Sequence, residues 1–246
     1  MKFRKTAIRL LFAPILFLYS LNISAQESDS SIRPRVNKIY SLPRPANKNY
    51  LSTKSLIIPT AFVGYGFTSL TSGGLQSLNK KICEEVEEDC SGFNTRADDY
   101  LKYAPAASVY LLNLVGVKGR HKILDRTIIL AMSSILSAQF VTALKHGTHQ
   151  LRPDGSTYNS FPSGHTTTAF VGAELMNQEF GWRSPWYSVA GYSMAAGTAL
   201  LRIMNNRHWL SDVITGAGIG MLTTKFSYWL YSKWENRNHA KQLLYY

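Results

Sequence analysis

The chain of 246 residues carries 27 Lys and Arg against 15 Asp and Glu, a formal net charge of +12. This length suits one domain with a substantial core, and the positive charge suits an anionic ligand. The sequence shows neither a basic helix face nor the alternation of basic and aromatic residues found in nucleic-acid binders, which argues against a nucleic-acid partner.

The N-terminal segment, residues 1–25, has the pattern of a secretory signal peptide. Four basic residues precede an apolar run over 10–21, and a plausible cleavage site ends at Ala25. An uncleaved membrane anchor is the alternative. Cleavage would remove four basic and no acidic residues and lower the net charge from +12 to +8. We expect an exported protein, located in the periplasm or in the cell-envelope membrane.

A polar arm is expected over residues 26–54, where three prolines prevent a long helix. The domain that follows, 55–235, contains apolar stretches of helical length and almost no strand-like alternation. The six stretches cover residues 55–76, 98–117, 123–146, 164–180, 186–204 and 209–232. We therefore predict an all-α six-helix bundle, followed by a C-terminal tail over 236–246.

The sequence leaves open whether these helices cross a membrane. Residues 127–144 are eighteen in a row without a charge, which is only just enough for a span. Trp and Tyr cluster near helix ends, as interfacial aromatic residues do, but the core and rim of a soluble bundle would use them equally well. The mean hydropathy of the chain is low for six spans.

The two cysteines, Cys83 and Cys90, bracket an acidic run. In an exported chain, a pair this close in sequence predicts a small disulfide loop that pins a surface hairpin. A zinc site is the alternative, but two thiolates without a nearby histidine make a poor one.

A first candidate motif closes the third apolar stretch, at Lys145 to Pro153. Lys145 and Arg152 are seven residues apart, so two helical turns or a folded loop can bring both cations to one point. Taken alone the signal is weak, because basic residues at a helix C-terminus are expected from the helix dipole.

The second motif is Pro162-Ser163-Gly164-His165. Pro162 favours a first helical turn, and Ser160 is expected to cap it. Gly164 allows close approach of the backbone to a ligand, and unpaired N–H groups at a helix start bind anions. A plain helix start is the alternative explanation.

The third motif contains Arg202, His208 and Asp212. His208 and Asp212 are four residues apart, so they share one face of a helix. A carboxylate there fixes the tautomer of the imidazole and leaves its second nitrogen free as a nucleophile. Arg202 offers a planar fork for a tetrahedral oxyanion. A structural His–Asp hydrogen bond is the alternative.

Taken in order, the three motifs resemble those of the type 2 phosphatidic acid phosphatase (PAP2)/vanadium haloperoxidase superfamily. The resemblance covers residues 145–212, and the order of the six helices matches that family as well. One departure is Leu201, where the family usually has a serine just before the arginine of the third motif. This puts one supporting contact in doubt.

The resemblance implies a role for each motif residue. His208 would attack phosphorus and form a phosphohistidine, Asp212 would orient it, and His165 would protonate the leaving oxygen. The phosphate would be held by Lys145, Arg152, Ser163, Gly164 and Arg202. Three cations would then do the work of a metal ion, so neither metal nor cofactor is expected. A zinc site built from His146, His149 and His165 is the weaker alternative.

The implied activity is hydrolysis of a phosphomonoester or diphosphate, most simply of a lipid: an isoprenyl diphosphate, a phosphatidate-type lipid or lipid A. Alternatives are a vanadate-dependent haloperoxidase, because vanadate mimics phosphate, and a non-catalytic envelope protein that binds lipid headgroups. A cleaved signal followed by six spans would place the site in the cytoplasm, in conflict with a disulfide. We therefore expect an envelope-associated periplasmic enzyme.

Overall fold

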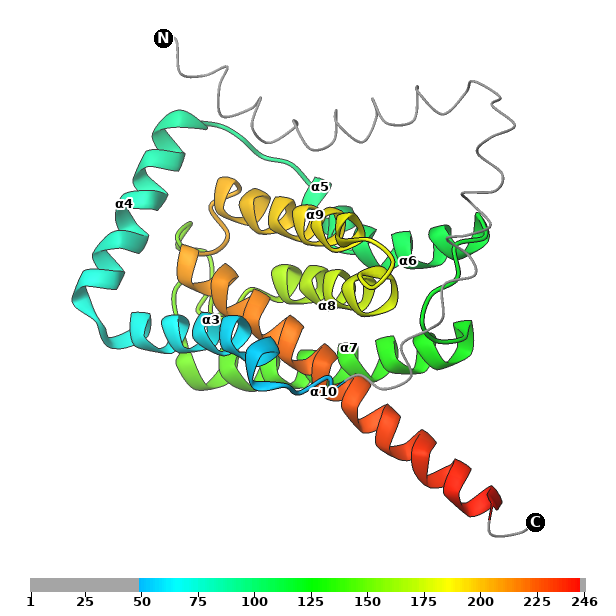
Figure 1. The fold of residues 1–246 in the computed structure, drawn as a ribbon. Coiled ribbons are helices and arrows are strands. Elements are labelled where there is room, and N and C mark those ends of the chain that lie inside the picture. Colours follow the sequence, from blue (N-terminus) through cyan, green and yellow to red (C-terminus); the bar gives the residue numbers. More distant parts are fainter. Residues whose placement is uncertain (1–48, 244–246) are drawn as a thin grey trace, which may run out of the picture.

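The computed structural model describes residues 49–243, with side chains to residue 237, and this part of the chain is all-α (Figure 1). The expected signal peptide and nearly all of the polar arm lie outside the described residues. The helices are α3 (Thr53–Thr71), α4 (Gly73–Asp89), α5 (Ala97–Leu101), α6 (Ala104–Leu114), α7 (Ile123–Thr148), α8 (Gly164–Phe180), α9 (Pro185–Met204) and α10 (Leu210–Leu243).

Helix α8 lies at the centre of the bundle, between α6, α7, α9 and α10 (Figure 1). It is buried on nearly all sides, so even its polar side chains need partners inside the bundle. Glu174 accepts a hydrogen bond from Lys225 at 2.6 Å, and Glu179 accepts one from Tyr228 at 2.8 Å. Both donors belong to α10, so buried charge as well as apolar contact joins these two helices.

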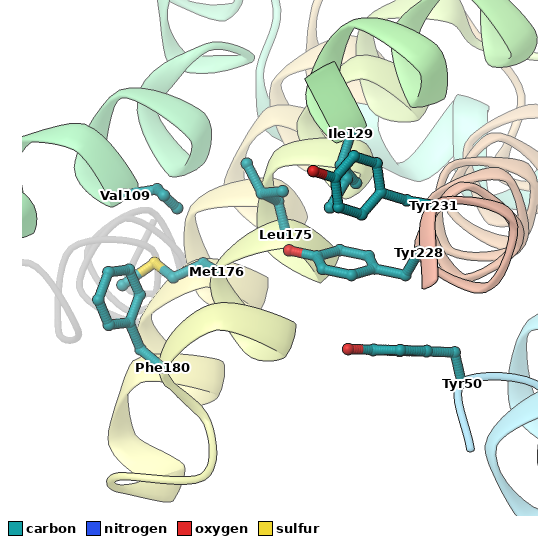
Figure 2. Close-up of a cluster of buried hydrophobic side chains, with 8 residues drawn as sticks. All are labelled: Tyr50, Val109, Ile129, Leu175, Met176, Phe180, Tyr228 and Tyr231. Atoms are coloured by element: carbon teal, nitrogen blue, oxygen red, sulfur yellow. The ribbon is translucent and has the colours of Figure 1, made fainter. Parts of the chain in front are cut away.

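The main apolar core includes Leu175, Met176 and Phe180 of the C-terminal half of α8 (Figure 2). It joins side chains of α6, α7, α8 and α10 to Tyr50, which precedes α3. The ring of Tyr50 stacks on that of Tyr228 with centroids 5.1 Å apart. The cluster consists of Tyr50, Val109, Ile129, Leu175, Met176, Phe180, Tyr228 and Tyr231.

Two glycines let the neighbouring helices come close to α8. A Cβ at Gly216 of α10 would lie 2.6 Å from the carbonyl oxygen of Ser163, and one at Gly172 would lie 2.7 Å from the backbone nitrogen of Ala106 in α6. Real side chains do not approach backbone atoms so closely. The first contact brings the start of α10 against the start of α8, where the second and third motifs meet.

The six predicted apolar stretches are all helical, but the six-helix count is wrong. The stretch 98–117 forms two helices, α5 and α6, and an unpredicted helix, α4, follows α3, so the described residues form eight helices. Helix α10 continues to Leu243, through most of the expected tail. Helix α4 braces the third motif: Asn79 donates a hydrogen bond to Ser211 Oγ at 2.8 Å and accepts one from its backbone N–H at 3.2 Å.

Cys83 and Cys90 are both free cysteines, so the structure does not contain the expected disulfide between them. Cys83 lies in α4 and Cys90 caps its C-terminus, so the seven-residue separation corresponds to about 10 Å along a helix. A disulfide needs Cα atoms within about 7 Å. Cys83 Sγ instead lies 3.0 Å from Asn206 Oδ1, in the loop of the third motif.

Helix α7 is the one helix among the described residues that is long and apolar enough to cross a membrane. Only 22% of its most apolar window is buried inside the bundle. Ile135 is 61% exposed and Phe140 is 52% exposed on its outer side. A helix of this kind is less covered by protein than a core helix of a soluble protein would be.

Candidate active site

The first motif contributes Lys145, in the last turn of α7. Its ammonium group donates hydrogen bonds to the carbonyl oxygens of Asn159 and Ser160, the latter at 3.4 Å. Both acceptors lie in the loop that leads into the second motif. Lys145 therefore brings one positive charge to the N-terminal end of α8.

Arg152 lies in the loop between α7 and α8. The loop is joined to the third motif by Asp154, whose backbone N–H donates to the carbonyl of Asn206 at 3.2 Å and whose carboxylate accepts from Arg207 at 3.0 Å. Burial, followed by the nearby charge of Arg202, lowers the pKa of the Arg152 guanidinium. Its buried Nε has no hydrogen-bond partner within residues 49–243.

Arg202, at the end of α9, is held by a carboxylate that the sequence analysis did not select. Its Nη1 donates to Asp98 Oδ2 at 2.7 Å, and Asn205 Nδ2 donates to Asp98 Oδ1 at 3.2 Å. Asp98 belongs to α5 and is 2% exposed. In the described part of the chain the Arg202 Nε is buried without a partner, so this edge of the guanidinium is available to an anion.

Helix α8 begins at Gly164, and its N-cap is Ser163, not the expected Ser160. The Ser163 Oγ accepts hydrogen bonds from the Thr166 backbone N–H at 3.5 Å and from the Thr166 hydroxyl at 3.0 Å. The Ser163 hydroxyl proton is then left to donate. The N–H groups of the first turn, including that of Gly164, have no acceptor within a helix, which is the arrangement that binds phosphate.

His208 and Asp212 come together, but they do not share one helix face as predicted: His208 lies in the loop just before α10, and Asp212 lies in the first turn of that helix. His208 Nδ1 lies 3.4 Å from Asp212 Oδ2, and this oxygen also accepts from the Trp209 backbone N–H at 3.0 Å. Ser160, displaced from the capping role, donates its hydroxyl to the same oxygen. The Ser163 backbone N–H donates to the Asp212 carbonyl at 3.0 Å, so the second and third motifs are in direct contact.

The His208 imidazole is 2% exposed, and this burial has an electrostatic consequence. Desolvation, opposed by Asp212 and aided by the charges of Arg202 and Lys145, lowers the pKa of His208 from 6.5 to about 4. With Nδ1 against the carboxylate, Nε2 is the nitrogen that can attack an electrophile. The imidazole is therefore neutral, and its Nε2 lone pair is available, throughout the neutral pH range.

We expect NMR titration to find the His208 imidazole signals moving with a midpoint near pH 4, assigned by their loss in His208→Gln. A histidine in the unfolded chain titrates near pH 6.5. The unfolded state therefore binds the proton more readily between these values, so this group makes the fold less stable as the pH falls from about 6.5 to 4. A midpoint at or above 6.5 would contradict the buried, neutral nucleophile.

His165, in the first turn of α8, has partners that the sequence analysis missed. Its Nε2 lies 2.7 Å from Asp99 Oδ1 and 3.1 Å from Lys102 Nζ. Adjacent carboxylates at the start of an apolar stretch, with a lysine three residues on, were the available signal. Burial lowers the pKa of His165, Asp99 raises it, and the charges of Arg202 and Lys102 lower it further.

One group of side chains near the site has the composition of a metal site. Ligand atoms of Asp98, Asp99 and His165 lie within 4.8 Å of one another. Each of them already has a partner, however: Asp98 pairs with Arg202, and Asp99 pairs with His165. His146 and His149 are exposed and belong to no such group among the described residues. The charges in this cluster are balanced without a cation.

Comparisons with known proteins relate the segment that contains the three motifs to one family. Residues 126–236 match the model of the PAP2 superfamily. Over 139 residues the chain is 44% identical to a lipid A 1-phosphatase of Porphyromonas gingivalis; the match covers 56% of this chain and 31% of the relative. The chain thus spans about a third of the length of the curated relative that it matches.

Two solved structures are similar. The first transmembrane PAP2 type phosphatidylglycerolphosphate phosphatase from Bacillus subtilis has a TM-score of 0.50 at 17% identity, with 73% of this chain and 96% of that chain covered. LpxE of Aquifex aeolicus has a TM-score of 0.47 at 21% identity, with 61% and 94% covered. The Bacillus structure supports the fold. The segment 126–236, which contains all three motifs, is similar to the PAP2 superfamily.

Proposed function

We propose that the protein is a lipid phosphate phosphatase that removes phosphate from a lipid A-type glycolipid in the cell envelope. The observation that carries this proposal is the group of three cations, Lys145, Arg152 and Arg202, whose charges act on the His208–Asp212 pair. Two of them, Arg152 and Arg202, have a buried Nε that no described residue pairs with. Phosphoryl transfer needs charge neutralisation and alignment above all, and this arrangement supplies both.

The proposed reaction has two steps. His208 Nε2 attacks phosphorus and forms an N–P bond while the P–O bond to the lipid breaks, and His165 gives a proton to the leaving oxygen. Water, deprotonated by His165, then breaks the N–P bond, releases phosphate and restores both imidazoles. Asp212 holds the tautomer of His208 in both steps.

The phosphate oxygens are assigned to the remaining motif residues. Lys145, Arg152 and Arg202 would neutralise the charge that a metal ion neutralises in many phosphatases, so the proposed reaction needs no metal. The Ser163 hydroxyl and the Gly164 N–H would complete the cradle at the positive end of α8.

The substrate class rests on two supports. The matched relative is a lipid A 1-phosphatase, which is 44% identical over 139 residues. The second support is the surface: α7 is apolar and little covered, and Leu114 and Trp186 are 80% and 68% exposed. Such a surface suits contact with lipid. Because the cysteines are free, a disulfide gives no objection to a membrane location.

A phosphate-release assay on the purified full chain tests the proposal. The substrates are lipid A, phosphatidate, an isoprenyl diphosphate and a soluble phosphomonoester, each with and without a chelator. We expect the highest kcat/KM on lipid A, unchanged by the chelator, and no halide oxidation with vanadate, bromide and peroxide. No release from any lipid phosphate, or clear halide oxidation, would contradict the proposed function.

A further inference from the structure

The short helix α5 places two charged side chains against His165 of α8. Asp99 Oδ1 is 2.7 Å and Lys102 Nζ 3.1 Å from the same imidazole nitrogen, Nε2. Asp99 and Lys102 also form an ion pair at 3.9 Å. Neither residue belongs to the three motifs, and both lie more than 60 positions before His165 in the sequence.

The two partners favour different protonation states of His165. A carboxylate accepts only from a protonated Nε2, whereas an ammonium group donates only to an Nε2 that carries no proton. Asp99 therefore favours the form in which Nε2–H points to the carboxylate and Nδ1 is left for the substrate. Lys102 opposes that form electrostatically, and its positive charge makes an imidazolium release its proton more readily.

This is the arrangement that a general acid and base requires. In the imidazolium form, Nε2–H would stay with Asp99 while the proton on Nδ1 passes to the leaving oxygen. The neutral ring that results, still held by Asp99, has an Nδ1 lone pair to accept a proton from the attacking water. The Asp99 carboxylate would thus hold the His165 ring in the same orientation during both steps.

The space beside His165 supports this assignment. A cavity of about 440 Å³ lies between the start of α6, the middle of α7 and the start of α8, and His165, Gly164 and Lys102 are among its lining residues. A cavity of this size accommodates a small organic group. The leaving group of a bound phosphate ester would therefore lie on the side of the site where α5 holds His165.

We propose that Asp99 is the positioning residue of the leaving-group step: its carboxylate holds His165 Nε2 so that Nδ1 delivers the proton to the departing oxygen. This inference rests on the proposed phosphatase function and adds to it a residue outside the family's motifs. Asp99 acts through His165 and need not touch the substrate.

The test compares leaving groups that differ in their need for a proton. Octyl phosphate releases a strongly basic alkoxide, whereas p-nitrophenyl phosphate releases an anion that is stable without protonation. General acid help from a histidine contributes about 10²–10⁴-fold. We expect Asp99→Asn to lower kcat/KM for octyl phosphate by about 10²-fold and for p-nitrophenyl phosphate by less than about 3-fold, with Asp99→Glu restoring part of the loss.

A matched control is Asp89→Asn, because Asp89 is an exposed carboxylate in the last turn of α4 and belongs to none of the three motifs. It should leave both rates unchanged. If Asp99→Asn lost activity equally on the two substrates, the role of Asp99 would be merely structural. If it lost no activity on either substrate, Asp99 would have no role in the reaction. Both outcomes would overturn this inference and leave the phosphatase proposal standing. A wild-type chain that hydrolyses neither substrate nor any lipid phosphate would overturn the proposed function and this inference with it.

Discussion

Replacing His208 with glutamine is expected to abolish turnover, with kcat lower by a factor on the order of 10⁴ or more, because a covalent nucleophile has no substitute among its neighbours. Glutamine keeps a polar side chain of similar length beside Asp212, so the fold should survive. The measurement is phosphate release from lipid A, with thermal unfolding of both proteins followed in parallel.

The matched control is His146→Gln. His146 follows Lys145 in the last turn of α7, but its side chain is exposed. The variant should retain wild-type activity within about 3-fold. A His208→Gln chain that folds and keeps a tenth of the wild-type rate would place the nucleophile elsewhere.

Replacing Arg202 with lysine is expected to lower kcat/KM by about 10²–10³-fold, the loss seen when one preorganised donor to a developing anion is removed, or about 3–4 kcal/mol of barrier. Lysine keeps the charge, but it cannot bind Asp98 through Nη1 and present Nε–H to an anion at the same time. The loss should appear in kcat as well as KM, because the charge on the phosphoryl oxygens is redistributed in the transition state.

Arg207→Lys is the control for this second substitution. Arg207 lies in the loop that follows α9, but its side chain is 43% exposed and bound to Asp154, so exchange should change kcat/KM by no more than a few-fold. If Arg202→Lys behaved like Arg207→Lys, the guanidinium geometry at position 202 would have no role in catalysis.

The helices were predictable because each apolar stretch is long enough to be buried as a helix. Helix α4 was missed for a physical reason: it is rich in charge, and only one face of it is covered. Leu75, Asn79, Ile82 and Val86 recur at helical spacing along that face, and the pattern was readable. The cysteine spacing was interpreted as a loop, although seven residues are equally two turns of one helix.

The contact between His208 and Asp212 was predictable because the two residues are only four positions apart, although His208 lies before α10 and not within it. The long-range partners of the motif residues were not predictable. Asp98 is 104 residues before Arg202, and Asp99 is 66 before His165. No local spacing indicates which carboxylate in the chain a buried cation will meet, because that depends on how α5 packs against α8 and α9.

The most direct test of the account is to trap the covalent intermediate. Substrate labelled in the phosphoryl group is mixed with the full chain, quenched in base within the first turnover, and the labelled peptide is sequenced. We expect about one label per active chain, stable to base and labile to acid, on the peptide that contains His208, and none on His208→Gln. Turnover with no such label, or label on another residue, would contradict it.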